Sequence, residues 1–476
     1  MPSPPRRGRD SSPRNLHAGA SRRDVLRGAA AAAGALTIEA CHGGPGPVSA
    51  GSAAPGAAGV PAPGPRIPGA LEVKGTRFYK DDKPFFVSGF NYWSPMPAIT
   101  RDGDAGWDRA RRDLDGMQAL GVNLLRIMGA TEGPDTEPLR IVPTLQPALG
   151  QYDPKAAAAL ARFVSELERR GMHAIITLNN FWPWSGGMGQ YMSWTGSGPI
   201  PYPPPQPRGD WNHYQNWVAL FYSNPRAVEA FNNLIRFLVP PLKASPAVIW
   251  QLCNEPRGMN NVKAFNDWIG PTAGLIKALA PSQLVTTGTE GLTGSPTYAG
   301  MDPVRNHRSP NIDFMTFHMW AENWGWVNKD RLDKGLPKAL ELARKYIDKH
   351  TDLAAQLGKP LLLEEFGFPR DGGSFVPGSP TTLRDKYYDA VYGMVHNAIG
   401  TTPMAGVLPW AWAGETKPPR PGEYWRVGDP FTGDPPHEQQ GWYSVYTDDT
   451  TTKLIQSWSA RLATIGAAAP AAAGSV

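Results

Sequence analysis

Short apolar runs recur eight times after residue 83, with longer amphipathic segments between them. The runs end near Asn91, Arg126, Asn180, Asn254, Glu290, His318, Glu365 and Trp412. The segments with helical periodicity include residues 107–120, 156–170, 225–238, 336–357 and 382–399. Strands that alternate with helices favour right-handed βαβ units in a parallel sheet, and eight such strands can close into a barrel. The sequence therefore predicts an α/β fold, a (β/α)8 TIM barrel.

An open doubly wound sheet is the alternative arrangement of the same elements. Sheets of that kind that bind dinucleotides carry a G-x-G-x-x-G motif after the first strand, and this chain has no such motif there. Two segments fall outside the repeating pattern. Residues 71–87 predict an N-terminal hairpin that feeds the first strand and closes the bottom of the barrel. The Pro- and Trp-rich residues 181–217 predict a long ordered loop after the third strand, over the barrel mouth.

The two ends of the chain differ in composition from its middle. The twin arginines Arg22 and Arg23 precede an apolar run of eleven residues, 28–38, an order that resembles a twin-arginine export signal. Eleven residues are too few to cross a membrane as a helix. We expect a signal at residues 1–50, a Gly/Pro/Ala-rich linker at 51–68, the barrel at 69–465 and a flexible Ala-rich tail at 466–476.

The signal has two alternative processing sites. Cleavage after Ala50 would follow the small residues V-S-A, whereas lipid attachment at Cys41 would follow I-E-A. The second site resembles a lipobox imperfectly, because Glu39 stands where that motif has a small or apolar residue. Either outcome predicts an exported protein, periplasmic or extracellular, and the second would make it a lipoprotein.

The distribution of charge argues against nucleic acid as a partner. The net charge is +5, but the first fifty residues hold seven Arg, no Lys and three acidic residues, which is +4 of that total. The remainder is left with about +1, too little for a broad field that attracts phosphate backbones. Only Cys41 and Cys253 are present, so no disulfide framework supports the fold, and Cys253 is expected to be buried and inert. We expect a monomer.

Polar residues end several of the apolar runs, where an unpaired charge would be costly to bury. In a parallel barrel the carboxyl ends of all strands open at one face, so these residues meet there. Glu255 and Glu365 end the fourth and seventh runs, and two carboxyls about 5 to 5.5 Å apart can carry out retaining glycoside hydrolysis. On spacing alone, the same acids could instead form ion pairs with Arg126 or Arg257.

Two motifs around these glutamates are more specific. Residues 250–257, W-Q-L-C-N-E-P-R, resemble the N-E-P motif on the fourth strand of clan A glycoside hydrolases. Residues 361–367, L-L-L-E-E-F-G, resemble the seventh-strand motif of the same clan. The resemblance implies that Glu255 is the acid/base, that Glu365 is the nucleophile and that Asn254 holds the 2-hydroxyl of the sugar.

Further motifs across residues 70–415 resemble glycoside hydrolase family 5, in particular its endo-β-1,4-mannanase branch. The family pattern implies that Arg126 positions the nucleophile and that Trp410 forms the floor of the subsite for the attacked sugar. Asn179 and Trp182 belong to a segment, L-N-N-F-W, that is similar to the third loop of the mannanases. Both residues are therefore candidates for substrate binding.

Three residues near these motifs raise separate expectations. His318 and Trp320 stand where the family has His-x-Tyr, so an indole, which can donate but not accept, replaces a Tyr whose oxygen contacts the nucleophile. We expect His318 to bind substrate or to brace the site as a hydrogen-bonding strut. Because side chains alternate along a strand, Glu364 should point away from Glu365, toward a helix or a neighbouring strand.

The chemistry implied by the resemblance needs only two acids and water. Glu255 must act protonated and Glu365 ionised, so we expect the pKa of Glu255 to lie above that of Glu365. Flat indole rings can stack on pyranose faces, and four are candidates for doing so. The candidates are Trp93, Trp182, Trp320 and Trp410. No cluster of His, Cys or acidic residues has metal-ligand spacing, so we expect neither a metal nor another cofactor.

The sequence thus predicts a retaining enzyme that cleaves β-1,4-linked mannan-type polysaccharides. Two rivals keep the mechanism and change the substrate or mode: a β-1,4-glucanase, and a β-mannosidase that acts at chain ends. A third rival is a glycan-binding barrel without catalysis, against which the intact pair of glutamates argues. Endo action is carried over from the resemblance alone.

Overall fold

The computed structural model describes residues 64–468. The export signal expected at residues 1–50, Cys41 and most of the expected linker therefore lie outside the described residues. Within the described range, no helix has both the length and the apolar character that crossing a membrane requires.

Eight parallel strands form the centre of the fold. They are β4 (Val87–Asn91), β5 (Leu124–Met128), β6 (His173–Thr177), β7 (Val248–Gln251), β8 (Val285–Thr286), β9 (Met315–Trp320), β10 (Leu361–Gly367) and β11 (Met404–Val407). Their hydrogen-bonded order is β8-β7-β6-β5-β4-β11-β10-β9. Backbone bonds from Asp313 N to Val285 O and from His318 N to Glu290 O bridge the remaining seam between β8 and β9. The predicted TIM barrel is confirmed.

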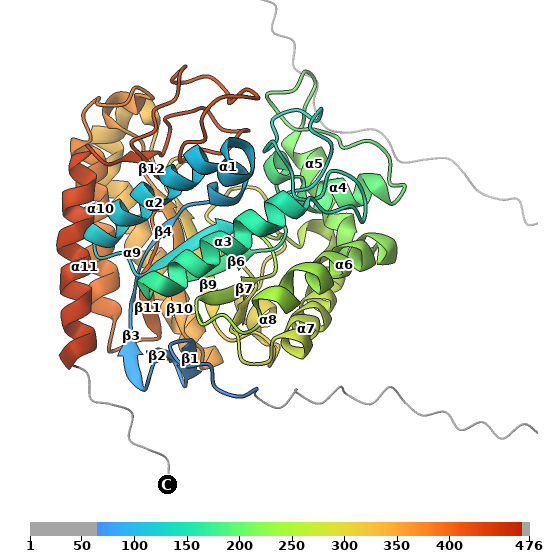
Figure 1. Ribbon diagram of the computed structural model, residues 1–476. Helices are drawn as coiled ribbons and strands as arrows, with labels where there is room; N and C mark the ends of the chain where they lie inside the picture. Colours follow the sequence, from blue (N-terminus) through green and yellow to red (C-terminus); the bar gives the residue numbers. More distant parts are fainter. Residues whose placement is uncertain (1–63, 469–476) are drawn as a thin grey trace, which may run out of the picture. The chain divides into compact units, whose positions relative to one another are not determined.

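Helices surround these strands (Figure 1). They are α1 (Pro95–Asp102), α2 (Asp104–Ala119), α3 (Pro154–Arg170), α4 (Gly187–Trp194), α5 (Trp211–Val218), α6 (Pro225–Leu242), α7 (Val262–Leu279), α8 (Pro303–His307), α9 (Leu332–Leu357), α10 (Thr382–Ala398) and α11 (Thr450–Ala468). Each of the five predicted helical segments coincides with a helix to within a few residues. The expected loop at 181–217 contains α4 and α5, and α11 extends three residues into the expected tail.

The ends of the helices follow from local sequence signals. Helix α3 begins after Asp153, whose carboxylate accepts a bond from the Lys155 N–H, and it ends at Gly171, which has a φ of 65°. Helix α6 begins after Asn224, whose side chain accepts from two backbone N–H groups of the first turn. These caps fix where the helices leave and return to the strands that carry the polar residues.

The N-terminal segment closes the bottom of the barrel, as predicted, but with three strands instead of a hairpin. These are β1 (Leu71–Lys74), β2 (Arg77–Lys80) and β3 (Lys83–Phe85), paired antiparallel in that order. The expected first strand is broken because Gly75, with a φ of 60°, turns the chain back on itself. Phe78 packs edge-on against Phe314 inside the barrel, with 5.1 Å between ring centroids. Figure 1 shows this small sheet at the lower end of the strands.

Inward-facing side chains change from apolar to polar along the barrel axis. The lower layer is a buried apolar cluster: Val87, Leu124, Ile175, Ile249, Leu284, Phe314, Leu362 and Ala405. Two residues further along each strand the side chain points inward again. Two residues above this layer lie Arg126, Thr177, Gln251, Thr286 and Glu364, and four residues above it lie Asn91 and His318. The polar groups therefore gather at one face, above a closed apolar floor.

The eighth strand ends earlier than the sequence suggested. Strand β11 stops at Val407, and the chain then crosses the mouth to form β12 (Trp412–Gly414), which pairs with β13 (Val445–Tyr446). Trp412 does not end a barrel strand, because its indole N–H donates to the buried carboxylate of Asp113, 3.1 Å away on α2. The residues between β12 and β13 lie over the barrel mouth as a long connection.

Candidate active site

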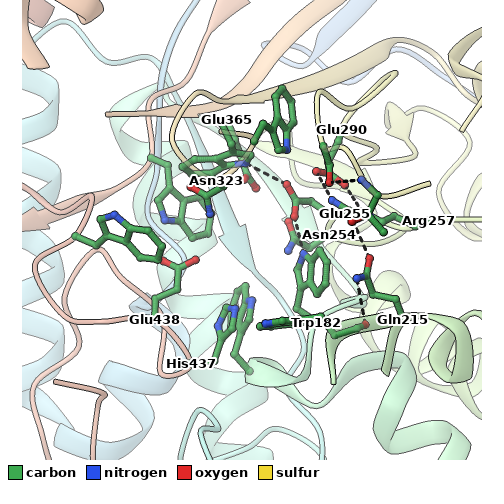
Figure 2. Close-up of a pocket in the computed structure, with 18 of the residues that line it drawn as sticks. Trp182, Gln215, Asn254, Glu255, Arg257, Glu290, Asn323, Glu365, His437 and Glu438 are labelled. Atoms are coloured by element: carbon green, nitrogen blue, oxygen red, sulfur yellow. Dashed lines mark hydrogen bonds and ion pairs between the residues drawn. The ribbon is translucent and has the colours of Figure 1, made fainter. Parts of the chain in front are cut away.

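A pocket of about 540 Å³ opens at the carboxyl ends of the strands. Its lining includes six of the residues singled out in the sequence: Trp182, Asn254, Glu255, Trp320, Glu365 and Trp410. Figure 2 shows the two glutamates facing the same space, with indole rings on both sides of it. Residues that are separated by more than two hundred positions in the chain are thus brought to one cavity, as the predicted barrel requires.

Glu255 and Glu365 approach the same imidazole. His318 Nδ1 lies 2.6 Å from Glu255 Oε1 and 3.3 Å from Glu365 Oε2. One oxygen of each carboxylate and a nitrogen of His318 all lie within 4.8 Å of one another. His318 is fully buried beneath the two acids, as a strut would be. The two carboxyls predicted to converge do so.

Arg126 binds the carboxylate of Glu365. Its Nη1 forms an ion pair with Glu365 Oε1, and its Nη2 donates to Asn254 Oδ1 over 2.6 Å. The remaining donors reach Asn91 Oδ1 at 3.1 Å and Gln251 Oε1 at 2.9 Å. One guanidinium therefore fixes the carboxylate of Glu365 and the amide of Asn254 relative to each other.

Glu364 corrects the expectation drawn from strand alternation. Its carboxylate accepts two bonds from Gln251 Nε2, at 2.7 and 2.8 Å, and lies 3.2 Å from His318 Nε2. It also lies 3.4 Å from Arg126 Nε, so it points into the barrel. The register of β10 against β9 shifts between Leu363 and Glu365, and this irregularity lets two successive carboxylates reach the same buried cluster.

Three donors surround the carboxylate of Glu255. Trp182 Nε1 donates to Oε2 over 2.5 Å, and Trp320 Nε1 donates to Oε1 over 3.3 Å, beside His318. The indole of Trp320 therefore donates a hydrogen bond to Glu255, whereas the Tyr of the family pattern contacts the nucleophile. The backbone of Glu255 has a φ of 48°, a left-handed conformation that costs a non-glycine residue roughly 1 to 2 kcal/mol.

The order of the two pKa values is the reverse of the expected one. Burial raises the pKa of Glu365 to about 7, against the opposing charges of His318 and Arg126. Burial also opposes ionisation of Glu255, but the hydrogen bond and charge of His318 outweigh it and lower the pKa to about 2. His318 is itself held cationic, with a pKa of about 10, because the carboxylates outweigh its burial. Between pH values of about 2 and about 7, Glu255 and Glu365 together therefore hold one proton.

Glu255, His318 and Glu365 also form a group of ligand-type atoms close enough to hold a metal ion, which the sequence spacing did not suggest. In the described part of the chain these atoms already bond to one another and to Trp182. The cationic Arg126 lies against the same cluster and offsets its negative charge. The atoms of Glu255, His318 and Glu365 that could bind a metal ion therefore already have partners within the protein.

The other predicted residues have different surroundings. Trp410 lines the pocket, and its buried indole N–H has no hydrogen-bond partner among residues 64–468. Trp93 does not line the pocket; it donates to Gly433 O over 2.8 Å. Asn179 does not line it either, and its Oδ1 accepts from the N–H of Asn180. Asn180 Oδ1 accepts instead from Asn254 Nδ2, so Asn180 and Arg126 together orient the amide of Asn254.

Several lining residues were missed by the sequence reasoning. They include Trp184, Trp211, Gln215, Asn323, Tyr424, His437, Glu438 and Trp442. Four of these lie in the connection between β12 and β13, where Asp434 accepts bonds from the N–H groups of Gly441 and Tyr443 and so shapes the loop. An available signal was the placement of aromatic and acidic residues directly after the last strand, because any such loop must cross the mouth.

Comparison with known proteins agrees with this architecture. A family model described as "GH family 5 beta-mannosidase-like" matches residues 70–467. A putative mannan endo-1,4-beta-mannosidase 4 of Arabidopsis thaliana is 29% identical over 362 residues, which cover 72% of this chain and 83% of that protein. Mannan endo-1,4-beta-mannosidase A of Podospora anserina is also 29% identical, over 72% of this chain and 82% of its own length.

A solved structure shares the fold and about a third of the aligned residues. The glycoside hydrolase family 5 mannosidase of Rhizomucor miehei is 31% identical, with a TM-score of 0.76 over 85% of this chain and 100% of that one. The barrel, the paired glutamates and the family match agree with one another. The chain therefore belongs to the β-mannosidase-like proteins of glycoside hydrolase family 5.

Proposed function

We propose that this enzyme is a retaining glycoside hydrolase that cleaves β-1,4-mannosidic linkages in mannan or glucomannan. The observation that carries the proposal is the spacing of Glu255 and Glu365, whose nearest relevant oxygens lie within 4.8 Å. This separation is close to the roughly 5 to 5.5 Å of retaining enzymes and short of the roughly 6.5 to 9.5 Å at which inverting enzymes hold an attacking water. The activities named for the Arabidopsis and Podospora relatives support mannan as the substrate.

The chemistry proceeds in two displacements. Glu365 attacks the anomeric carbon while Glu255 donates a proton to the departing oxygen, which gives a covalent glycosyl-enzyme. Glu255 then removes a proton from water, and the water attacks the same carbon and restores the carboxylate of Glu365. Arg126 stabilises that carboxylate throughout. The unpartnered N–H of Trp410 is free to donate to a sugar hydroxyl above its ring.

The single proton of the pair must lie on Glu255 when substrate is bound. In the empty pocket it favours Glu365, whose pKa is about 7. Positive charge that develops at the anomeric carbon favours an ionised Glu365, and the departing oxygen accepts a hydrogen bond only from a protonated Glu255. Substrate binding therefore moves the proton from the nucleophile to the acid, and the singly protonated pair is the reactive form.

This assignment predicts how activity depends on pH. We expect kcat/KM for phenyl β-mannoside to fall as the pH rises through about 7, because the pair then loses its only proton. A nearby cation lowers the pKa of a carboxyl, so His318→Gln should move this alkaline limb to higher pH. Initial rates measured across the pH range test both statements. A limb that moves to lower pH in the variant would contradict the role given to the charge of His318.

The substrate and the stereochemistry can be tested in one experiment. Digests of mannan, glucomannan and cellulose are followed by proton NMR from the first minutes, so that the anomer released first is seen before mutarotation. We expect β-anomers of mannose-terminated products, and faster turnover on mannan than on cellulose. Initial α-anomers would contradict the retaining mechanism, and faster turnover on cellulose would favour the glucanase alternative.

Exo action is a second candidate mode, and one observation favours it. His437, Glu438 and Trp442, from the connection between β12 and β13, line the pocket, and Figure 2 shows Glu438 across the cavity from Arg257. A wall of side chains there would confine the substrate to few sugars on that side of the pocket. Sizing the early products of mannotetraose and mannan decides between the modes, because exo action releases mannose from the outset and endo action releases mixed oligosaccharides.

A further inference from the structure

One wall of the pocket contains an ion pair that the proposed mechanism does not use. Arg257 donates through Nε and Nη2 to the two oxygens of Glu290, at 2.6 and 2.8 Å, in a fork-to-fork arrangement. Its Nη1 donates to Gln215 Oε1 over 2.8 Å. Both charged side chains are more than nine-tenths buried, and Figure 2 shows them on the side of Glu255, opposite Glu438.

The first link from this pair to the acid/base runs through an indole. The guanidinium carbon of Arg257 lies 4.9 Å from the ring centroid of Trp182, within the range of a cation–π contact. The same indole donates its N–H to Glu255 Oε2 over 2.5 Å. The guanidinium of Arg257 therefore holds the Trp182 ring in the orientation in which its N–H reaches the carboxylate of Glu255.

The second link runs through the backbone. Glu255 has a left-handed conformation, with its N–H bonded to Gly288 O, and Arg257 follows two residues later in the same turn. Glu290 is itself anchored, since its carbonyl oxygen accepts from the N–H of His318 and from the hydroxyl of Tyr346. The ion pair thus ties the strained turn to the strand that carries His318.

We propose that the Arg257–Glu290 pair is a positioning device for Glu255, which acts through the Trp182 indole and through the turn that carries the acid. The inference rests on the proposed function, because it assigns a role within that reaction. Three of the five N–H donors of Arg257 are already used inside the protein. Its positive charge also lowers the pKa of Glu255, after the larger effects of burial and His318.

A series of aryl β-mannosides isolates the step in which Glu255 acts as an acid. A 2,4-dinitrophenolate leaves without protonation, 4-nitrophenolate needs little help, and phenolate needs a proton. Because kcat/KM reports formation of the glycosyl-enzyme, it is compared across the three substrates for the parent and for Arg257→Lys, Glu290→Gln and Trp182→Phe. The lysine keeps the charge of Arg257 but loses its two parallel donors, and the phenylalanine keeps an aromatic ring at position 182 but has no N–H.

We expect each variant to lose roughly 10- to 100-fold on phenyl β-mannoside and less than about threefold on the dinitrophenyl substrate, as for a displaced acid. The matched control is Arg370→Lys, which alters an ion pair in which Nη2 of Arg370 donates to both oxygens of Asp449; this pair is equally buried but lies outside the pocket lining. Its losses should be equal across the series. Glu290→Gln and Trp182→Phe keep the test usable if Arg257→Lys does not fold.

The remaining outcomes overturn the inference or the function separately. Equal losses across the aryl series would make the pair merely structural. If kcat/KM is unchanged for all three aryl substrates and only KM for mannotriose rises, Arg257 binds the leaving sugar instead. If the parent cleaves neither the aryl β-mannosides nor mannotriose nor mannan, the proposed function fails before the variants are compared.

Discussion

Replacing Glu365 with Ala is expected to lower kcat/KM for 2,4-dinitrophenyl β-mannoside by roughly four orders of magnitude or more, the scale seen when a catalytic nucleophile is removed. The glycosyl-enzyme cannot form without this carboxylate, and a better leaving group does not replace it. Arg126 would also lose its closest anionic partner in a buried cluster. The variant is assayed alongside the parent by release of dinitrophenolate, with thermal unfolding as the check on folding.

Chemical rescue identifies the role of Glu365 more sharply than the loss of rate. Azide can enter the space left by the missing carboxylate and attack the anomeric carbon from that face. We expect azide to restore release of dinitrophenolate and to give α-mannosyl azide, of inverted configuration. Recovery of β-mannosyl azide would place the lost carboxylate on the other face of the sugar and contradict its assignment as nucleophile.

Replacing Glu255 with Ala should give a loss that depends on the leaving group. We expect kcat/KM for phenyl β-mannoside to fall by about 10² to 10⁴-fold, the contribution of general acid catalysis, and that for the dinitrophenyl substrate to change far less. The glycosyl-enzyme formed from the activated substrate should then accumulate, because water lacks its base. A burst of dinitrophenolate followed by a slow steady state measures both effects.

The product of azide rescue differs for this variant. Azide attacks the glycosyl-enzyme from the face where the carboxylate of Glu255 stood, so it should speed the slow phase and yield β-mannosyl azide. Glu415→Ala is a suitable control, because that glutamate is about three-quarters exposed and lies outside the pocket lining. Losses of equal size on all leaving groups would contradict the acid/base role.

Local sequence signals predicted most of the architecture. Apolar runs and amphipathic segments gave the strands and helices, because burial on one or both faces imposes its period on the sequence. In the structure the side chains of Asp153 and Asn224 fix where α3 and α6 begin, since they bond to the free N–H groups of the first turn. The N-E-P and E-F-G motifs singled out Glu255 and Glu365, which the barrel brings to one cavity.

Other features depend on contacts between distant segments. The strand-alternation rule failed between Glu364 and Glu365, because the shift in pairing of β10 against β9 has no local signal in the sequence. The eighth strand was extended too far, since Trp412 is as apolar as a strand residue but bonds to Asp113 on α2. The residues of the connection between β12 and β13 reach the pocket only because Asp434 shapes that loop.

The sequence by itself determined which residues can do the chemistry, because reactive side chains and their neighbouring motifs are written in short segments. Only the tertiary structure decided how they are charged. The pKa order of Glu255 and Glu365 follows from burial and from the placement of His318 between them, and electrostatic energies depend on distances and solvent exposure rather than on position in the chain. Those distances exist only once the strands have closed into a barrel.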